Sequence, residues 1–184
     1  MCPDEAIEAI KPAVRTNRTY ILAEALVMIA LAAALYMFKL FTFPEGGSIT
    51  LGSMVPIFVL SLRRGPKVGI VAGACLGIIV LLIEPFVYNP VQFILDYPLP
   101  FALLGVSGFF KKWPIAGVGV GISLRFVCHF LSGALYFCGY MPTYYKSCPV
   151  YSVVYNASYL IPEFAISALM IFILSRRHIL TVSA

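Results

Sequence analysis

Six apolar stretches, separated by short polar or glycine- and proline-rich turns, constrain this chain more than any other feature of its sequence. About 20 apolar residues in a helix cross the hydrocarbon core of a bilayer. The chain is 61% apolar and only 11% charged, so lipid must be its main solvent. We therefore expect an all-α integral membrane protein, a bundle of six transmembrane helices. The stretches cover residues 20–41, 50–62, 68–83, 91–110, 114–137 and 150–174.

Two of these stretches depart from a regular span. The second is short and contains Pro56, so we expect it to be tilted, accommodated by a thinner bilayer, or partly interfacial. The fourth contains Asp96 followed by Pro98 and Pro100, and the prolines should kink its helix. The chain as a whole divides into a polar N-terminal segment (1–19), a six-helix membrane domain (20–178) and a C-terminal tail (179–184).

The positive charges gather in turns that share one side of the membrane if the chain crosses six times. Cytoplasmic loops are enriched in Lys and Arg, so both termini are placed in the cytoplasm. The opposite loops hold only Lys146, with Lys39 near the end of a span. Because the cations lie in clusters between apolar runs, we expect no nucleic-acid partner despite the net charge of +5. The cytoplasmic cations are Lys11, Arg15, Arg18, Arg63, Arg64, Lys67, Lys111, Lys112, Arg176 and Arg177.

Polar side chains within the spans fall into two layers. Arg125 and His129 lie one helical turn apart on one face of the fifth stretch, and this face must point into the protein because ionisable groups are costly in lipid. Helical rise places Arg125 at the depth of Glu163. We expect a structural ion pair between Arg125 and Glu163, or else Asp96, because a buried arginine needs a carboxylate. The outer layer consists of Glu84, His129, Tyr151 and Asn156.

The outer layer has two interpretations. Each side chain taken alone is explained as a polar contact that holds helix ends together. Taken together, they offer an acid, an imidazole, a phenol and an amide near many aromatic residues, which is typical of a pocket for a flat polar heterocycle. A cation would gain further from ring faces and from the charge of Glu84. A polyphosphate is disfavoured, since the outer loops lack the Arg and Lys groups that would bind it.

The sequence contains no pattern typical of catalysis, nucleotide hydrolysis or metal binding. It has no GxSxG, HExxH or GxxxxGK[ST] motif, and its five cysteines show no CxxC spacing. We therefore expect no enzymatic activity, no cofactor and no metal, and the energy for any uphill transport must come from another subunit or from an ion. Cys138 and Cys148 flank one outer loop, and the sequence leaves open whether they form a disulfide.

Several motifs, in order along the chain, resemble the substrate-binding (S) components of energy-coupling factor (ECF) thiamine transporters. This resemblance covers nearly the whole chain from about residue 23. It implies a six-helix protein of the prokaryotic plasma membrane that captures thiamine with high affinity from outside. It also implies a transmembrane coupling subunit and two ATPase subunits as partners, and pyrimidine binding by Glu84, His129, Tyr151 and Asn156. The motifs are GGSITLGSMVP at 46–56, RRGPKVG at 63–69, NPVQ at 89–92, LDYP at 95–98 and YSVVYN at 151–156.

The resemblance also assigns a docking surface and exposes one departure. S components dock the coupling subunit through an AxxxA pattern in the first helix, which Ala30 and Ala34 match; from spacing alone, this face would be interpreted as packing within the chain. The family commonly lines its pocket with tryptophan, but Trp113 lies at the cytoplasmic end of the fifth stretch. Tyr136 or Phe137 must then supply the stacking surface, with lower affinity or a changed substrate range.

The first outer loop, residues 42–49, is expected to act as a lid with glycine hinges. Three alternatives remain open at this point. The same scaffold could be specific for a thiamine precursor such as hydroxymethylpyrimidine, or for another small vitamin. An ion-coupled carrier would use Asp96, Arg125 and Glu163 as a relay. A structural membrane subunit would bind no ligand.

Overall fold

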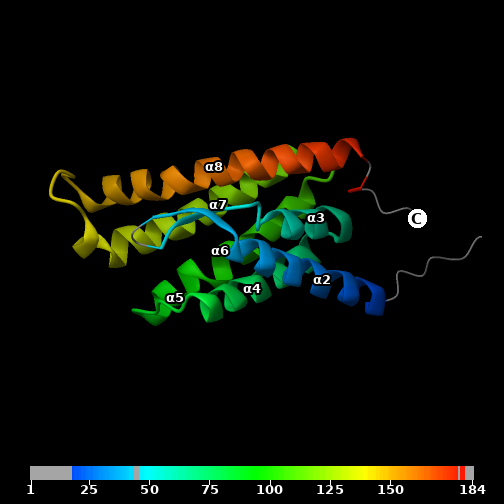
Figure 1. Cartoon of the computed structure of the whole chain (residues 1–184), viewed down its shortest axis with the longest axis horizontal. Helices are drawn as coiled ribbons and strands as arrows, with labels where there is room; N and C mark the ends of the chain where they lie inside the picture. Colours follow the sequence, from blue (N-terminus) through cyan, green and yellow to red (C-terminus); the bar gives the residue numbers. More distant parts are fainter. Residues whose placement is uncertain (1–17, 44–45, 178, 181–184) are drawn as a thin grey trace, which may run out of the picture.

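The computed structural model describes residues 18–43, 46–177 and 179–180, which form one bundle of long helices (Figure 1). Within these residues, five helical segments are long and apolar enough to cross a membrane, and the expected all-α membrane architecture is confirmed. Most of the polar N-terminal segment (1–19) and of the C-terminal tail (179–184) lies outside the described residues. The long elements are α2 (Arg18–Met37), α4 (Pro66–Ile83), α7 (Pro114–Tyr136), α8 (Cys148–Arg176) and the broken segment Pro90–Phe109.

The second crossing is made by a β-hairpin and a short helix instead of a full span. Helix α3 (Val55–Arg64) has ten residues, about 15 Å of length, which is half of a bilayer core. Strands β1 (Lys39–Thr42) and β2 (Ser48–Thr50) pair antiparallel and precede it. The first stretch thus ends as a helix at Met37 and continues as a strand. Non-helical backbone is tolerated at this depth because the two strands pair with each other and β2 packs against α8.

The fourth stretch is broken where the prolines predicted a kink. Helix α5 (Pro90–Asp96) is followed by Tyr97, whose backbone leaves the helical region (φ −116°, ψ −82°). Helix α6 (Pro98–Leu104) and the 3-10 helix η1 (Gly105–Phe109) then continue the crossing. Proline removes an N–H donor and restricts the residue before it, so α5 cannot run on into α6. Asp96 therefore sits at a helix end inside the bundle.

Close backbone contact joins α4 to this broken helix. A Cβ atom on Gly73 would overlap the carbonyl group of Phe101, and one on Gly77 would overlap that of Tyr97. Small residues let helices approach closely in lipid, and the glycine face of α4 allows α6 to lie directly against it. This contact fixes the position of Tyr97, and with it the end of α5, beside α4.

The two ends of the bundle differ in charge. The described chain ends both lie at one end (Figure 1), as six crossings require, and the basic turns after α3 and before α7 belong to the same end. The opposite end carries the loop with the 3-10 helix η2 (Cys138–Tyr140), which the Cys138–Cys148 disulfide closes. The disulfide that the sequence left open is therefore formed, at the end assigned to the outside.

Candidate functional site

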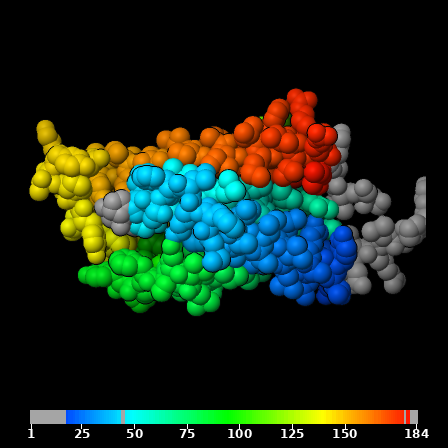
Figure 2. All heavy atoms as spheres, in the orientation of Figure 1, coloured from blue at the N-terminus to red at the C-terminus, as the bar shows by residue number. Residues whose placement is uncertain are grey.

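A cavity of about 500 Å³ lies in the outer half of the bundle, within the range of roughly 300–1,000 Å³ that is usual for small-molecule sites. Helices α2, α4, α7 and α8, the α5–α6 break and the β-hairpin all contribute to it. In the space-filling view the hairpin covers the face between α8 and the α4–α5 side (Figure 2). The predicted outer layer lines this cavity, since Glu84, His129, Tyr151 and Asn156 all face it, and so does Phe137.

Glu84 lies at the mouth of the cavity, where α4 ends before Pro85. One of its carboxylate oxygens contacts the ammonium group of Lys39, and the other accepts a hydrogen bond from the Tyr36 hydroxyl at 2.9 Å. Tyr36 comes from α2 and Lys39 from β1. The carboxylate thus ties the start of the hairpin to α4, and its charge has a counter-ion within the chain.

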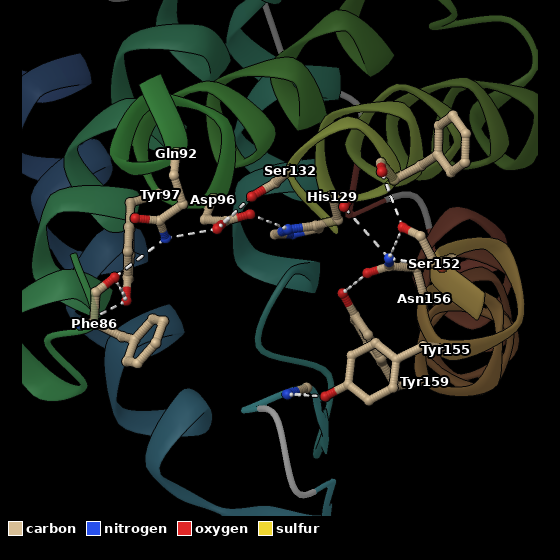
Figure 3. A network of polar contacts seen from close by, with 12 residues as sticks. Phe86, Gln92, Asp96, Tyr97, His129, Ser132, Ser152, Tyr155, Asn156 and Tyr159 are labelled. Carbon is tan, nitrogen blue, oxygen red and sulfur yellow. Dashed lines mark hydrogen bonds and ion pairs between the residues drawn. The ribbon is translucent and has the colours of Figure 1, made fainter. Parts of the chain in front are cut away.

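Asp96 and His129 form the polar centre of the cavity (Figure 3). One oxygen of Asp96 lies 3.2 Å from Nδ1 of His129, and the other accepts hydrogen bonds from Ser132 Oγ and Gln92 Nε2, each at 2.7 Å. Because an ionised carboxylate only accepts hydrogen bonds, it places the imidazole proton on Nδ1. Nε2 of His129 is buried and has no hydrogen-bond partner among the residues that the structure describes; in the neutral ring it is an acceptor.

The loop after α4 holds Gln92 in place. The residue is 1% exposed. Its Oε1 accepts from the Tyr88 N–H at 3.0 Å, and its Nε2 also donates to the Phe86 carbonyl at 3.2 Å. This fixes which end of the amide points at Asp96. Gln92 is four residues before Asp96 on α5, and this spacing puts both side chains on one face.

Asn156 joins α8 to α7 and fills the wall opposite Asp96 (Figure 3). Its Nδ2 donates to the Ser152 carbonyl at 2.8 Å and to the His129 carbonyl at 3.3 Å, while its Oδ1 accepts from the Tyr159 hydroxyl at 2.6 Å. Ser152 packs where a Cβ atom on Gly133 would lie. The amide therefore holds the carbonyl of His129 in position as well as lining the cavity.

Aromatic rings make up much of the remaining wall. Phe137 lies 5.8 Å from Phe86, centroid to centroid. On the other side, Tyr151 and Tyr155 line the cavity with their ring centroids 5.9 Å apart, and Tyr145 lies 5.1 Å from Tyr151, outside the lining. Ring faces of this kind bind flat heterocycles and cations. Of the two predicted stacking residues, Phe137 is in the lining of the described cavity and Tyr136 is not.

The expected ion pair of Arg125 with Glu163 or Asp96 is wrong. Within the described residues, Nε and Nη1 of Arg125 and Oε2 of Glu163 have no hydrogen-bond partner. Glu163 instead accepts from the backbone N–H and the hydroxyl of Thr50, on β2. The Arg125 guanidinium lies 4.0 Å from the ring centroid of Phe101. Arg125, Glu163 and Asp96 nevertheless all line the cavity.

The hairpin supplies polar groups, from both backbone and side chains, that the sequence pattern does not indicate. Its N–H at Gly47 donates to the Tyr155 hydroxyl at 2.9 Å, and Lys39 and Thr50 contact the carboxylates described above. Spacing could have identified Gln92 with Asp96, and Ser132 with His129, since each pair shares a helical face. The sequence contains no signal that residues 39–50 form a hairpin rather than the end of a span followed by a loop.

Comparison with known proteins places this architecture in a family. The family described as thiamine transporter protein matches residues 22–182. The thiamine transporter ThiT of Bacillus subtilis (strain 168) is 32% identical, over 89% of this chain and 91% of that protein. ThiT of Lacticaseibacillus paracasei is 31% identical over 48% of this chain and 54% of its own length. The solved structure of ThiT from Listeria monocytogenes has the same fold, with a TM-score of 0.80 at 24% identity, over 90% of this chain and 99% of that one. The chain belongs to the thiamine transporter protein family.

Proposed function

We propose that the cavity binds thiamine from the outer side, and that the chain is the substrate-binding subunit of an ATP-driven importer. Membership of a transporter family makes it a transport protein rather than an enzyme, and its apolar helices make it a multi-pass protein of the cell membrane. The observation that carries the proposal is the convergence of Glu84, Asp96, His129 and Asn156 on one aromatic-walled cavity.

The polar centre suits the aminopyrimidine of thiamine. This ring has an exocyclic amine that donates hydrogen bonds and ring nitrogens that accept them. The unpartnered Nε2 of His129 is an acceptor that can bind the amine, and Asp96 holds it in that tautomer. Tyr151 on α8 also lines the cavity, and its hydroxyl can donate to a ring nitrogen. The pyrimidine therefore lies against α7 and α8 in this proposal.

The mouth of the cavity suits the thiazolium, which carries the positive charge. Glu84, which the resemblance assigns to the pyrimidine, contributes a carboxylate at the mouth and in this proposal faces the thiazolium instead. Phe86 and Phe137 contribute aromatic rings with centroids 5.8 Å apart. Carboxylates and aromatic faces both stabilise a cation. Thiamine thus spans from His129 to Glu84, with its uncharged ring inside.

Energy for uptake comes from partners in this proposal, a transmembrane coupling subunit and two ATPases. Ala30 and Ala34 on α2 are exposed, while Ala25, Ile29 and Ala32 face the bundle. The small residues thus lie on the outer side of α2, where another protein can approach them closely. This position supports the assignment of Ala30 and Ala34 as the docking surface.

Calorimetry on the purified protein tests thiamine binding directly. We expect thiamine to bind more tightly than either its hydroxymethylpyrimidine half or its hydroxyethylthiazole half, and Glu84→Gln to weaken thiamine about tenfold or more. Glu24→Gln is the matched control, because this carboxylate binds Arg63 and Arg64 at the other end of the bundle. No heat with thiamine, or an unchanged affinity in Glu84→Gln, rejects the proposal. Equal affinity for the pyrimidine half would assign the site to a precursor.

A further inference from the structure

The cavity contains a cation that comes from the hairpin rather than from the helix bundle. Lys39 lies on β1, and its ammonium group contacts Glu84 at the mouth. Its side chain is 19% exposed and that of Glu84 is 41% exposed. The second oxygen of Glu84 is occupied by the Tyr36 hydroxyl at 2.9 Å. Both oxygens of the carboxylate proposed to balance the ligand charge are therefore already in contact with donors of the chain.

The other acidic groups of the cavity do not share this arrangement. Asp96 is bound by Gln92, His129 and Ser132, all from the bundle, and Glu163 is bound by Thr50. With His129 neutral, the described residues of the cavity lining include two cations, Lys39 and Arg125, and three carboxylates, a net charge of −1. Without the charge of Lys39 the same residues would carry a net charge of −2. Lys39 thus halves the net negative charge of the described lining.

We propose that Lys39 is a specificity-determining residue, an internal counter-ion that competes with the ligand's positive charge for Glu84. This inference rests on the proposed binding of thiamine. When a thiazolium approaches Glu84, the ammonium group either gives up the carboxylate or remains beside a like charge. Both cost free energy that an uncharged ring of the same shape does not incur. The residue lowers the preference of the site for cations over neutral analogues.

The size of the effect follows from the charges. The two charges are the ammonium group of Lys39 and the thiazolium of the ligand. At a separation of about 6 Å and an effective dielectric constant of about 20, their repulsion lowers the affinity by about a hundredfold. Since Glu84 is 41% exposed, solvent and salt screen this interaction, and we discount it to about tenfold. Lys39→Met should therefore raise, by about tenfold, the ratio of thiamine affinity to the affinity of an isostere in which thiophene replaces the thiazolium.

The experiment is calorimetry with thiamine and the thiophene isostere on four proteins: wild type, Lys39→Met, Lys39→Arg and Lys146→Met. Lys39→Arg keeps the charge and should keep the wild-type ratio. Lys146 is exposed in the outer loop between η2 and α8, so Lys146→Met should also keep it. The gain in Lys39→Met should shrink as salt is raised, because it is electrostatic.

Failure of this inference is distinguishable from failure of the proposed function. A wild-type protein that binds no thiamine rejects the function itself. A wild-type protein that binds thiamine, with a ratio that is unchanged or lower in Lys39→Met, overturns the role of Lys39. A ratio that rises equally in Lys39→Arg overturns it too, since geometry would then be the cause. If Lys39→Met binds neither ligand, Lys39→Gln is measured in its place, and loss of both ligands there also overturns the proposal.

Discussion

Replacement of Asp96 by asparagine tests the polar centre of the cavity with little change in shape. The carboxylate accepts from Gln92 and Ser132 at 2.7 Å each and lies 3.2 Å from Nδ1 of His129. An asparagine side chain has one acceptor oxygen and one NH2 donor. In either orientation of the asparagine amide, its NH2 group faces a donor where the native carboxylate offers an acceptor. That donor is His129 on one side, or Gln92 and Ser132 on the other.

Both orientations weaken the site. If the amide oxygen faces His129, the NH2 group points at the NH2 group of Gln92, two donors in contact. If it is reversed, Nδ1 of His129 must become the acceptor, so the ring proton moves to Nε2 and opposes the ligand amine. A hydrogen bond to a charged group contributes about 1.5–3 kcal/mol. Loss of about 2.7 kcal/mol corresponds to an affinity about a hundredfold lower.

The assay is calorimetric titration of Asp96→Asn with thiamine, together with thermal unfolding of the ligand-free protein to show that the fold is kept. Ser132→Ala is the matched control: it removes one donor but leaves the carboxylate on His129, and it should weaken binding only about fivefold, or about 1 kcal/mol. An affinity of Asp96→Asn within about threefold of the wild type would refute the assignment of His129 as an oriented acceptor.

Three further substitutions test packing, stacking and docking. Gly73→Ala should lower stability by about 1–3 kcal/mol in thermal unfolding, because its Cβ overlaps a carbonyl of α6; Gly119→Ala, whose Cβ meets its nearest atom at 3.7 Å, should not, and equal effects would contradict the close contact. Phe137→Ala should weaken thiamine binding about tenfold, and Tyr136→Ala less than twofold; the reverse order would assign the stacking to Tyr136. Ala34→Leu should leave thiamine binding intact and abolish ATP-driven uptake in vesicles with the partner subunits; normal uptake would exclude this face as the docking surface.

Local patterns made the helices predictable. The fifth stretch, 114–137, appears as α7 (Pro114–Tyr136), and the sixth, 150–174, as α8 (Cys148–Arg176). Apolar length and the placement of basic turns are properties of neighbouring residues, so no tertiary information is needed. Hydropathy does not distinguish a helix from a strand inside a bundle. This is why hydropathy alone places the region from Lys39 to Thr50, which forms the hairpin, partly in a span and partly in a loop.

The depth of each polar side chain along its helix was predictable from the sequence, whereas the direction in which it points was not. Helical rise placed Glu84, His129, Tyr151 and Asn156 in one layer, and they line one cavity. Depth also matched Arg125 with Glu163, but the donor that reaches Glu163 is Thr50, which enters from the hairpin. Rotation about the helix axis and the path of a non-helical segment are set by packing, which the sequence pattern does not report.

The hairpin is held to the bundle by chemically different contacts along its length. Lys39 at its start binds Glu84, Gly47 at its tip donates to Tyr155, and Thr50 at its end binds Glu163. Of these, the contact at Glu84 is an ion pair, and a ligand cation can replace it without breaking the other two. The contacts of Gly47 and Thr50 hold the hairpin over the cavity without involving Lys39, so ligand preference can change at Lys39 while these two contacts keep the hairpin in place.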